Sequence, residues 1–144
     1  MPVLLYGSKN WILTDSLMEK LEGFQAELAK RILKWPGHFS NTASITALEL
    51  PTMRCRVLER KLCFLQRVMG KEVGGLSARV REAFCDEVSS LCLVRECEEL
   101  EEALMTTHTG SILRGEAVET REIKEEIRKK DRQQSFSRCD EKSP

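Results

Sequence analysis

The sequence predicts an all-α fold: a small helical bundle of about four helices with a charged, partly disordered C-terminal tail. Three observations predict it. Of the 144 residues, 32% are charged and only 6% aromatic, a balance typical of long, solvated helices. Glycine and proline are sparse, at 8 and 4 residues, which disfavours a turn-rich β-sandwich or barrel. Two long segments carry apolar residues at the spacing of an amphipathic helix.

The first of these segments predicts a helix over residues 15–35. Its large apolar residues are spaced to form one stripe: Leu17, Leu21, Phe24, Leu28, Ile32 and Trp35. Ser16 and Glu19 have the spacing of a capping box, which satisfies free amides in the first turn. The pair Pro36 and Gly37 predicts the end of the helix.

The second segment predicts a long helix over residues 52–69, preceded by a short helix over 43–48. Asn41 or Thr42 would start the short helix, and Pro51 fits a helix start because its missing N–H would have been unpaired there. The apolar stripe of the long helix is formed by Leu58, Leu62, Leu65 and Met69. The opposite face carries four cations: Arg56, Arg60, Arg67 and Lys71. One face is thus expected in the core and the other against water or phosphate.

The remainder of the chain is expected to be less regular. Three glycines at 70, 74 and 75 predict a flexible connection, followed by helical segments through 77–91 and 93–104 with a break at the serines 89 and 90. Residues 106–115 have a loop-like composition.

Beyond residue 116, Ile123 and Ile127 are the only large apolar residues in 119–132, too few for a core-facing stripe. The i, i+4 pairs of Glu125 with Lys129 and of Glu126 with Lys130 add only ~0.2–0.5 kcal/mol each. We therefore expect a frayed helix, disorder over 135–144, and a tail that does not pack stably.

Zero net charge conceals a strong asymmetry along the chain. Residues 30–71 contain nine basic and two acidic residues, whereas residues 82–102 contain eight acidic residues and one basic. Such asymmetry can mark a polyanion-binding half. Two patches that face each other, or that simply remain solvated, would give the same pattern.

Patterns for metal and catalytic chemistry are missing from the sequence. The six cysteines form no Cys-x-x-Cys pair, so no zinc-ligand spacing is present, and Cys55, Cys63 and Cys85 are expected to act as small helix residues. Neither a phosphate loop nor a nucleophile elbow occurs. The sequence therefore predicts a chain that is not an enzyme and needs no cofactor, and we expect His38 to be structural or exposed to solvent.

A series of short motifs supplies the most specific information. In order they are LLYGS at 4–8, WILT at 11–14, LEGFQ at 21–25, RILKWP at 31–36, NT at 41–42, LP at 50–51, MRCR at 53–56 and KLxFLxRVM at 61–69. This order and spacing resemble the region just after the reverse-transcriptase palm in the polyproteins of animal non-LTR (LINE-type) retrotransposons. The resemblance covers residues 2 to about 105 and is weaker around 121–124 and at Cys139.

The resemblance implies a helical, thumb-like region over residues 1–105 and a charged linker and tail over 106–144. The family's catalytic pair of adjacent aspartates lies upstream of this region, and the four aspartates here are not adjacent. The resemblance thus implies a non-catalytic fragment of the polyprotein. A thumb grips the nucleic-acid backbone, so it also implies phosphate contacts without base readout. The candidate residues are Lys30, Lys34, Arg56, Arg60, Arg67 and Lys71.

Two functional hypotheses remain open at this point. The first is weak, sequence-independent binding of RNA or DNA. The second is a helical protein-interaction module or an inert remnant, with self-association through the surface that would pack on the missing palm. Trp35 could stack on a base, although core packing is the expectation for Trp35, Trp11 and Tyr6.

No apolar run reaches the ~18 residues of a membrane helix, and the absence of a signal-peptide pattern leads us to expect an intracellular location, nuclear or cytoplasmic.

Overall fold

The computed structural model describes residues 5–7, 14–69, 89–113, 116 and 118–141. Within these residues the chain forms six helices and no strand. They are α1 (Asp15–Leu33), α2 (Asn41–Ala47), α3 (Met53–Met69), α5 (Ser89–Leu104), α6 (Thr109–Leu113) and α7 (Thr120–Glu141). The all-α prediction is confirmed, with six helices where about four were expected. The predicted flexible connection at Gly70, Gly74 and Gly75, and most of the helix predicted over 77–91, lie outside the described residues.

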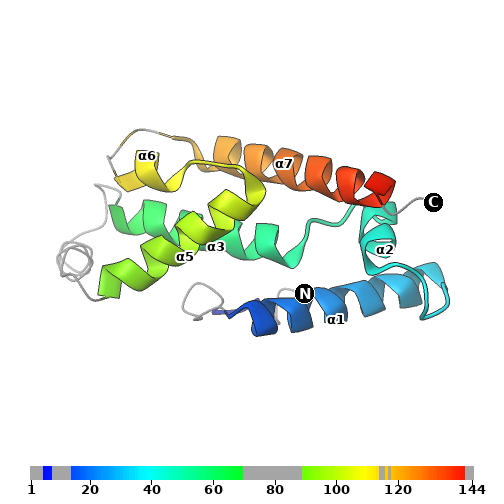
Figure 1. The fold of residues 1–144 in the computed structure, drawn as a ribbon. Coiled ribbons are helices and arrows are strands. Elements are labelled where there is room, and N and C mark those ends of the chain that lie inside the picture. The colour runs from blue at the N-terminus through cyan, green and yellow to red at the C-terminus, as the bar shows by residue number, and fades with distance from the viewer. Residues whose placement is uncertain (1–4, 8–13, 70–88, 114–115, 117, 142–144) are drawn as a thin grey trace.

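Helix α3 occupies the centre of the arrangement (Figure 1). Helices α1 and α7 lie on opposite sides of it, and α5 crosses it. The short helix α2 packs against both α1 and α7 at one end of the molecule, while α6 packs against α3 and α5 near the other.

Two apolar clusters surround α3 on different sides. Its residues Cys55, Leu58, Leu62 and Leu65 are buried against side chains from α5, α6 and α7. Its residues Met53 and Val57 are buried against α1 and Leu5. The predicted burial of Leu58, Leu62 and Leu65 is therefore confirmed. Because α3 contributes to both clusters, it packs against α1 on one side and against α5, α6 and α7 on the other.

The start of α1 differs in detail from the prediction. Thr14, rather than Ser16, is the N-cap: its side-chain oxygen accepts a hydrogen bond from the backbone N–H of Leu17 at 3.3 Å. The helix ends at Leu33, because Lys34 adopts a left-handed conformation with φ 54° and closes the final turn. The predicted helix over 15–35 is thus confirmed within two residues.

The buried face of α1 is rotated from the predicted stripe. The helix buries Met18, Leu21, Gln25, Ala26, Ala29 and Lys30, whereas Phe24 is 49% exposed and Ile32 68% exposed. Two alanines bring this face close to its neighbours, and the Gln25 side chain donates to the Pro51 carbonyl at 2.8 Å. The expectation that Phe24 and Ile32 face the core is therefore wrong.

The turn between α2 and α3 contains two caps. Ser40 is the N-cap of α2, one residue before the predicted Asn41 or Thr42, and its hydroxyl accepts from Ala43 N–H at 3.5 Å. At the start of α3 the Thr52 hydroxyl accepts from the Cys55 N–H at 3.3 Å. Helix α3 then runs to Met69, as predicted for 52–69.

The expectation of a frayed, unpacked tail is wrong for residues 120–141. They form the continuous helix α7, whose Ile123 and Ile127 are fully buried. Polar contacts add to these two apolar residues in docking α7 on α3. Asp131 accepts from the Thr52 N–H at 2.8 Å and from its hydroxyl at 2.6 Å, and Thr120 donates to Gln66 at 2.6 Å.

Two acidic residues of α5, Glu96 and Glu101, are used inside the fold. Lys61 on α3 is fully buried and pairs with Glu96. The carboxylate of Glu101 accepts from the backbone N–H groups of His108 at 2.5 Å and of Thr109 at 3.1 Å, which places a negative charge at the start of α6. The segment predicted as a loop over 106–115 therefore contains a short helix. Among the helices described, none has the length and apolar character needed to cross a membrane.

Candidate functional site

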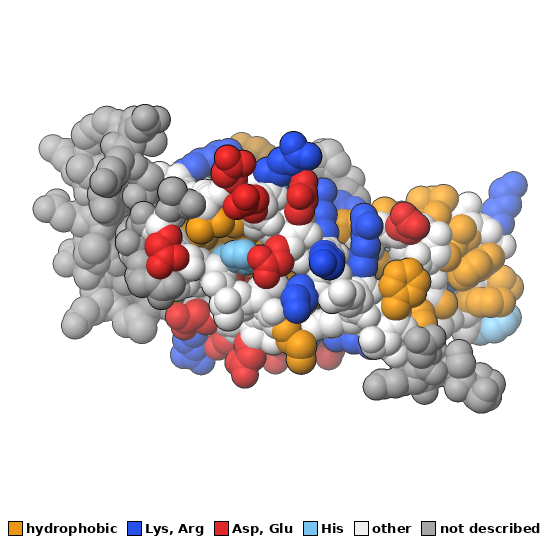
Figure 2. All heavy atoms as spheres, turned by 90° about the horizontal axis from the view of Figure 1, so that it is seen from above, with side chains coloured by type: hydrophobic (Ala, Val, Ile, Leu, Met, Phe, Trp, Pro, Cys, Tyr) orange, Lys and Arg blue, Asp and Glu red, His pale blue; other side chains and the backbone are white. Residues whose placement is uncertain are grey.

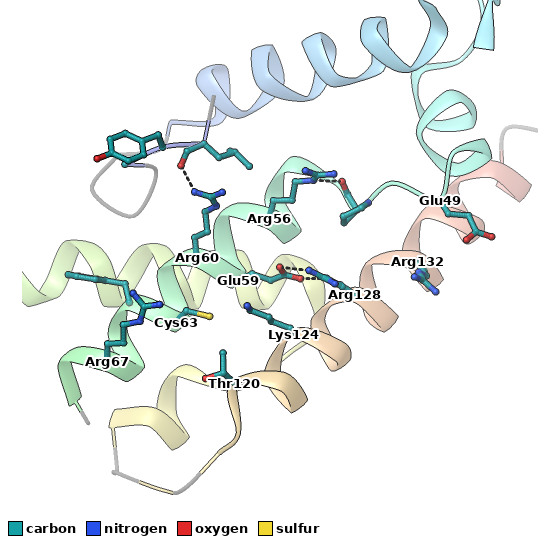
Figure 3. A pocket seen from close by; sticks show the side chains of 15 residues that line it. Glu49, Arg56, Glu59, Arg60, Cys63, Arg67, Thr120, Lys124, Arg128 and Arg132 are labelled. Atoms are coloured by element: carbon teal, nitrogen blue, oxygen red, sulfur yellow. Dashed lines mark hydrogen bonds and ion pairs between the residues drawn. The ribbon is translucent and has the colours of Figure 1, made fainter. Parts of the chain in front are cut away.

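A groove of about 860 Å³ lies between α3 and α7, with the N-terminal residues Leu5, Tyr6 and Gly7 along its edge. Its described lining includes six cations: Arg56, Arg60 and Arg67 from α3, and Lys124, Arg128 and Arg132 from α7 (Figure 3). Two carboxylates, Glu49 and Glu59, also line it. The lining therefore has an excess of four positive charges, which favours an anionic ligand.

The α3 cations hold the groove in shape as well as line it. Arg60 donates to the Leu5 carbonyl at 2.8 Å and so fixes the N-terminal segment on α3. Arg56, half-buried, donates to the Pro51 carbonyl at 3.4 Å. Arg67 is exposed and has no hydrogen bond or ion pair with the part of the chain that the structure describes. Among the predicted α3 cations that the structure describes, Arg67 is thus the one whose donors bind no other described residue.

The α7 cations are absent from the set that the sequence predicted. Lys124, Arg128 and Arg132 are four residues apart, a spacing that aligns side chains along one side of a helix. They follow directly after Ile123, Ile127 and Asp131, which are buried, so the cationic row lies beside the row that docks α7 on α3. The four-residue spacing is visible in the sequence. Because the sequence predicts an unpacked tail for this segment, it does not predict that this row of cations faces α3.

One of the α7 cations is neutralised within the groove. Arg128 makes two hydrogen bonds to the buried carboxylate of Glu59, at 2.6 and 3.1 Å (Figure 3). The hydrogen bond to Glu59 raises the pKa of Arg128 above its already high value. Lys124 and Arg132 make no hydrogen bond or ion pair with the described residues, so together with Arg67 they leave three cations for a ligand.

The other predicted site residues do not join this groove. Lys30 is buried, and its ammonium donates to the Gly37 carbonyl at 2.9 Å, so it fastens the turn after α1. Lys34 is exposed at the end of α1, and neither residue lines the groove. Lys71 lies outside the described residues. Of the five predicted residues that the structure describes, three therefore lie in the groove and two lie elsewhere.

The acidic helix α5 does not cover the groove. No described residue of α5 lines it; the half-buried Glu96 pairs with Lys61, and the buried Glu101 binds the start of α6. On the face that carries α7, Figure 2 shows Asp and Glu side chains toward the α6 end and Lys and Arg side chains toward the middle. Of the two alternatives, patches that face each other or that remain solvated, the pair of Lys61 with Glu96 agrees with the first inside the fold, whereas no described acidic residue of α5 reaches the groove.

The aromatic residues divide differently from the prediction. Tyr6 is 85% exposed at the groove, so the expectation that it is a core residue is wrong. Trp35 is half-buried and packs on Phe39, with ring centroids 5.2 Å apart. Trp11 lies outside the described residues. His38 is exposed, as expected.

The cysteines provide no metal site in the described residues, where no group of three or more His, Cys, Asp and Glu side chains could hold an ion. Cys55 is fully buried in α3, and Cys63 is half-buried beside the groove, as expected for small helix residues. Burial raises the pKa of the Cys55 and Cys63 thiols. Cys85 lies outside the described residues.

Comparison of the chain with models of protein families, with curated proteins and with solved structures finds no match in any of the three.

Proposed function

We propose that this chain binds the phosphate backbone of RNA or DNA in the groove between α3 and α7, without catalysis and without sequence preference. The observation that carries the proposal is the convergence of six cations from two helices on one groove, against two carboxylates. The ordered motifs described above support the same function, because they resemble the thumb-like region of a non-LTR retrotransposon reverse transcriptase. On this proposal the chain is a non-catalytic relative of that region.

Three cations of the groove, which have no partner among the described residues, set the expected strength of binding. Arg67 and Lys124 lie on opposite walls, and Arg132 continues the α7 wall (Figure 3). A protein that neutralises about three phosphates releases about as many counterions, so log K should fall with log salt at a slope of roughly −2 to −3. Such an interaction is weak at physiological salt and carries little sequence information.

The test is the salt dependence of binding to a fluorescent single-stranded oligonucleotide, measured by anisotropy. The double variant Arg67→Glu/Arg132→Glu reverses two exposed cations of the groove and should remove most of the affinity. Arg60 is unsuitable for this purpose because it also holds the Leu5 carbonyl. Far-UV circular dichroism would verify that the helices persist.

A matched control keeps the change in net charge identical. Lys20→Glu/Lys34→Glu reverses two exposed cations of the α1 region that do not line the groove. It should retain most of the binding. Equal losses in both double variants would show that binding follows net charge alone, and no binding by the wild type at about 50 mM salt would refute the function.

A second function, a helical protein-interaction module, is favoured by a different observation. Hydrophobic side chains gather on the surface at the end where α1 and α2 meet (Figure 2). Ile32 is 68% exposed and Phe39 44% exposed in this region. Exposed apolar patches favour self-association or capture of a partner. Light scattering coupled to size-exclusion chromatography separates the two functions: an oligomer without salt-dependent RNA binding would support the second.

A further inference from the structure

Tyr6 places a large, exposed aromatic side chain at the edge of the groove. Its side chain is 85% exposed, although the preceding Leu5 is 2% exposed and packs among Met18, Leu21, Met53 and Val57. The backbone before it is held by a hydrogen bond, and the backbone after it turns. Arg60 binds the Leu5 carbonyl at 2.8 Å, and Gly7 turns the chain with φ +75°, a conformation that favours glycine.

We propose that Tyr6 is a stacking platform for an unpaired base, so that the groove takes single-stranded nucleic acid in preference to duplex. This inference rests on the proposed function, since the cations of the groove must hold the phosphates beside the ring. A free aromatic face next to a cationic groove is the arrangement by which proteins bind single strands with little sequence preference, because every base has a π-face.

The other groove aromatic does not offer the same surface. Phe64 is half-buried and packs against the apolar cluster around α3. In a duplex the faces of the bases are covered by their neighbours, so a duplex can use the cations but not the ring. Selectivity for single strands should therefore depend on Tyr6, whereas affinity for phosphate should not.

The experiment compares three probes on the full chain: a single-stranded uridine dodecamer, a duplex of the same length, and inorganic polyphosphate of similar charge. Tyr6→Ala should weaken binding of the single strand about 5- to 150-fold, the range measured for loss of one stacking aromatic. Binding of polyphosphate should change less than about twofold. Tyr6→Phe keeps the ring and should keep the affinity, and Phe24→Ala removes an exposed aromatic outside the groove and should alter neither.

A spectroscopic measurement tests the stacking directly. Tyr6 is the only tyrosine of the chain, so its ring gives a single set of signals in a tyrosine-labelled NMR sample. Addition of the uridine dodecamer should shift these signals upfield, and addition of polyphosphate should not.

The outcomes separate this inference from the function on which it rests. The stacking role would be overturned, and the phosphate-binding function retained, if Arg67→Glu weakened binding of polyphosphate and of the single strand equally while Tyr6→Ala had no effect. Failure of all three probes to bind would overturn both. Tighter binding of the duplex than of the single strand by the wild type would also overturn the inference.

Discussion

Replacement of Asp131 by alanine should lower the free energy of unfolding by about 2–4 kcal/mol. Asp131 is 3% exposed on α7, and its carboxylate accepts two hydrogen bonds from Thr52, at 2.8 Å from the N–H and 2.6 Å from the hydroxyl. Thr52 in turn caps α3. One carboxylate thus joins α7 to the start of α3, through two residues that are 79 positions apart in the sequence.

The magnitude follows from the number of bonds and the burial of the partners. Two hydrogen bonds to a charged acceptor give about 3–6 kcal/mol as an upper range. Two effects reduce this loss. Thr52 is only half-buried, so in the variant water can bind its N–H and hydroxyl. Alanine also has a helix propensity better than that of aspartate by up to about 0.7 kcal/mol. An asparagine side chain would keep one acceptor oxygen, so Asp131→Asn should lose roughly half as much as Asp131→Ala.

Urea unfolding followed by circular dichroism measures the difference between wild type and variant. Lys129→Ala, an exposed change on the same helix, is the control and should alter stability by less than about 0.5 kcal/mol. A loss for Asp131→Ala as small as that of the control would refute the view that this contact docks α7.

Three further predictions concern the core, the C-terminal helix and the buried thiols. Leu62→Ala should cost about 2–5 kcal/mol in urea unfolding because Leu62 is fully buried, and Leu28→Ala clearly less because Leu28 is half-buried; equal losses would contradict the assigned faces. In limited proteolysis with trypsin, residues 120–141 should be cut no faster than α3, and early removal of α7 would show that it does not pack as described. Burial raises the pKa of the Cys97 thiol from 9.0 to about 12, so the unfolded chain releases a proton that the folded chain keeps, and stability should fall as pH rises from about 9 to 12. Cys97→Ala should lose less stability over the same interval, and parallel pH profiles for the two proteins would contradict the assignment.

Local signals are sufficient for the central helix. The predicted bounds 52–69 differ by one residue from the observed Met53–Met69, because Pro51 and Thr52 mark the start within the sequence itself. Leu58, Leu62 and Leu65 are buried as their spacing predicts. For this helix the residues that fix the ends and the core face are neighbours along the chain, so periodicity is enough.

Periodicity is not enough for α1, because it groups residues on a face without identifying which face a neighbour covers. The bulky series that includes Phe24 and Ile32 predicts one core stripe, but the neighbours approach the side of Ala26 and Ala29. Small residues permit close approach and give little signal in a hydrophobic pattern. The contact of Gln25 with Pro51 spans 26 residues and has no local signature.

The same limit explains the error at the C-terminus and half of the groove. Ile123 and Ile127 are too few to dock a helix by apolar contacts alone, whereas Asp131 and Arg128 add polar contacts to Thr52 and Glu59. The sequence shows the four-residue spacing of the α7 cations, but it contains no local signal that this helix docks beside α3. The resemblance-based boundary at residue 105 stays a prediction.

The position of the groove makes its proposed activity depend on the docking of α7. The buried row of Ile123, Ile127 and Asp131 lies one residue before the cationic row of Lys124, Arg128 and Arg132, so the contacts that place one row necessarily place the other. A polyanion that bridges the two walls binds only the docked arrangement. By mass action such a ligand stabilises that arrangement by RT ln(1 + [L]/Kd). Docking of the C-terminal helix and binding in the groove are therefore linked: a bound polyanion stabilises the docked helix, and a helix that docks more stably binds the polyanion more tightly.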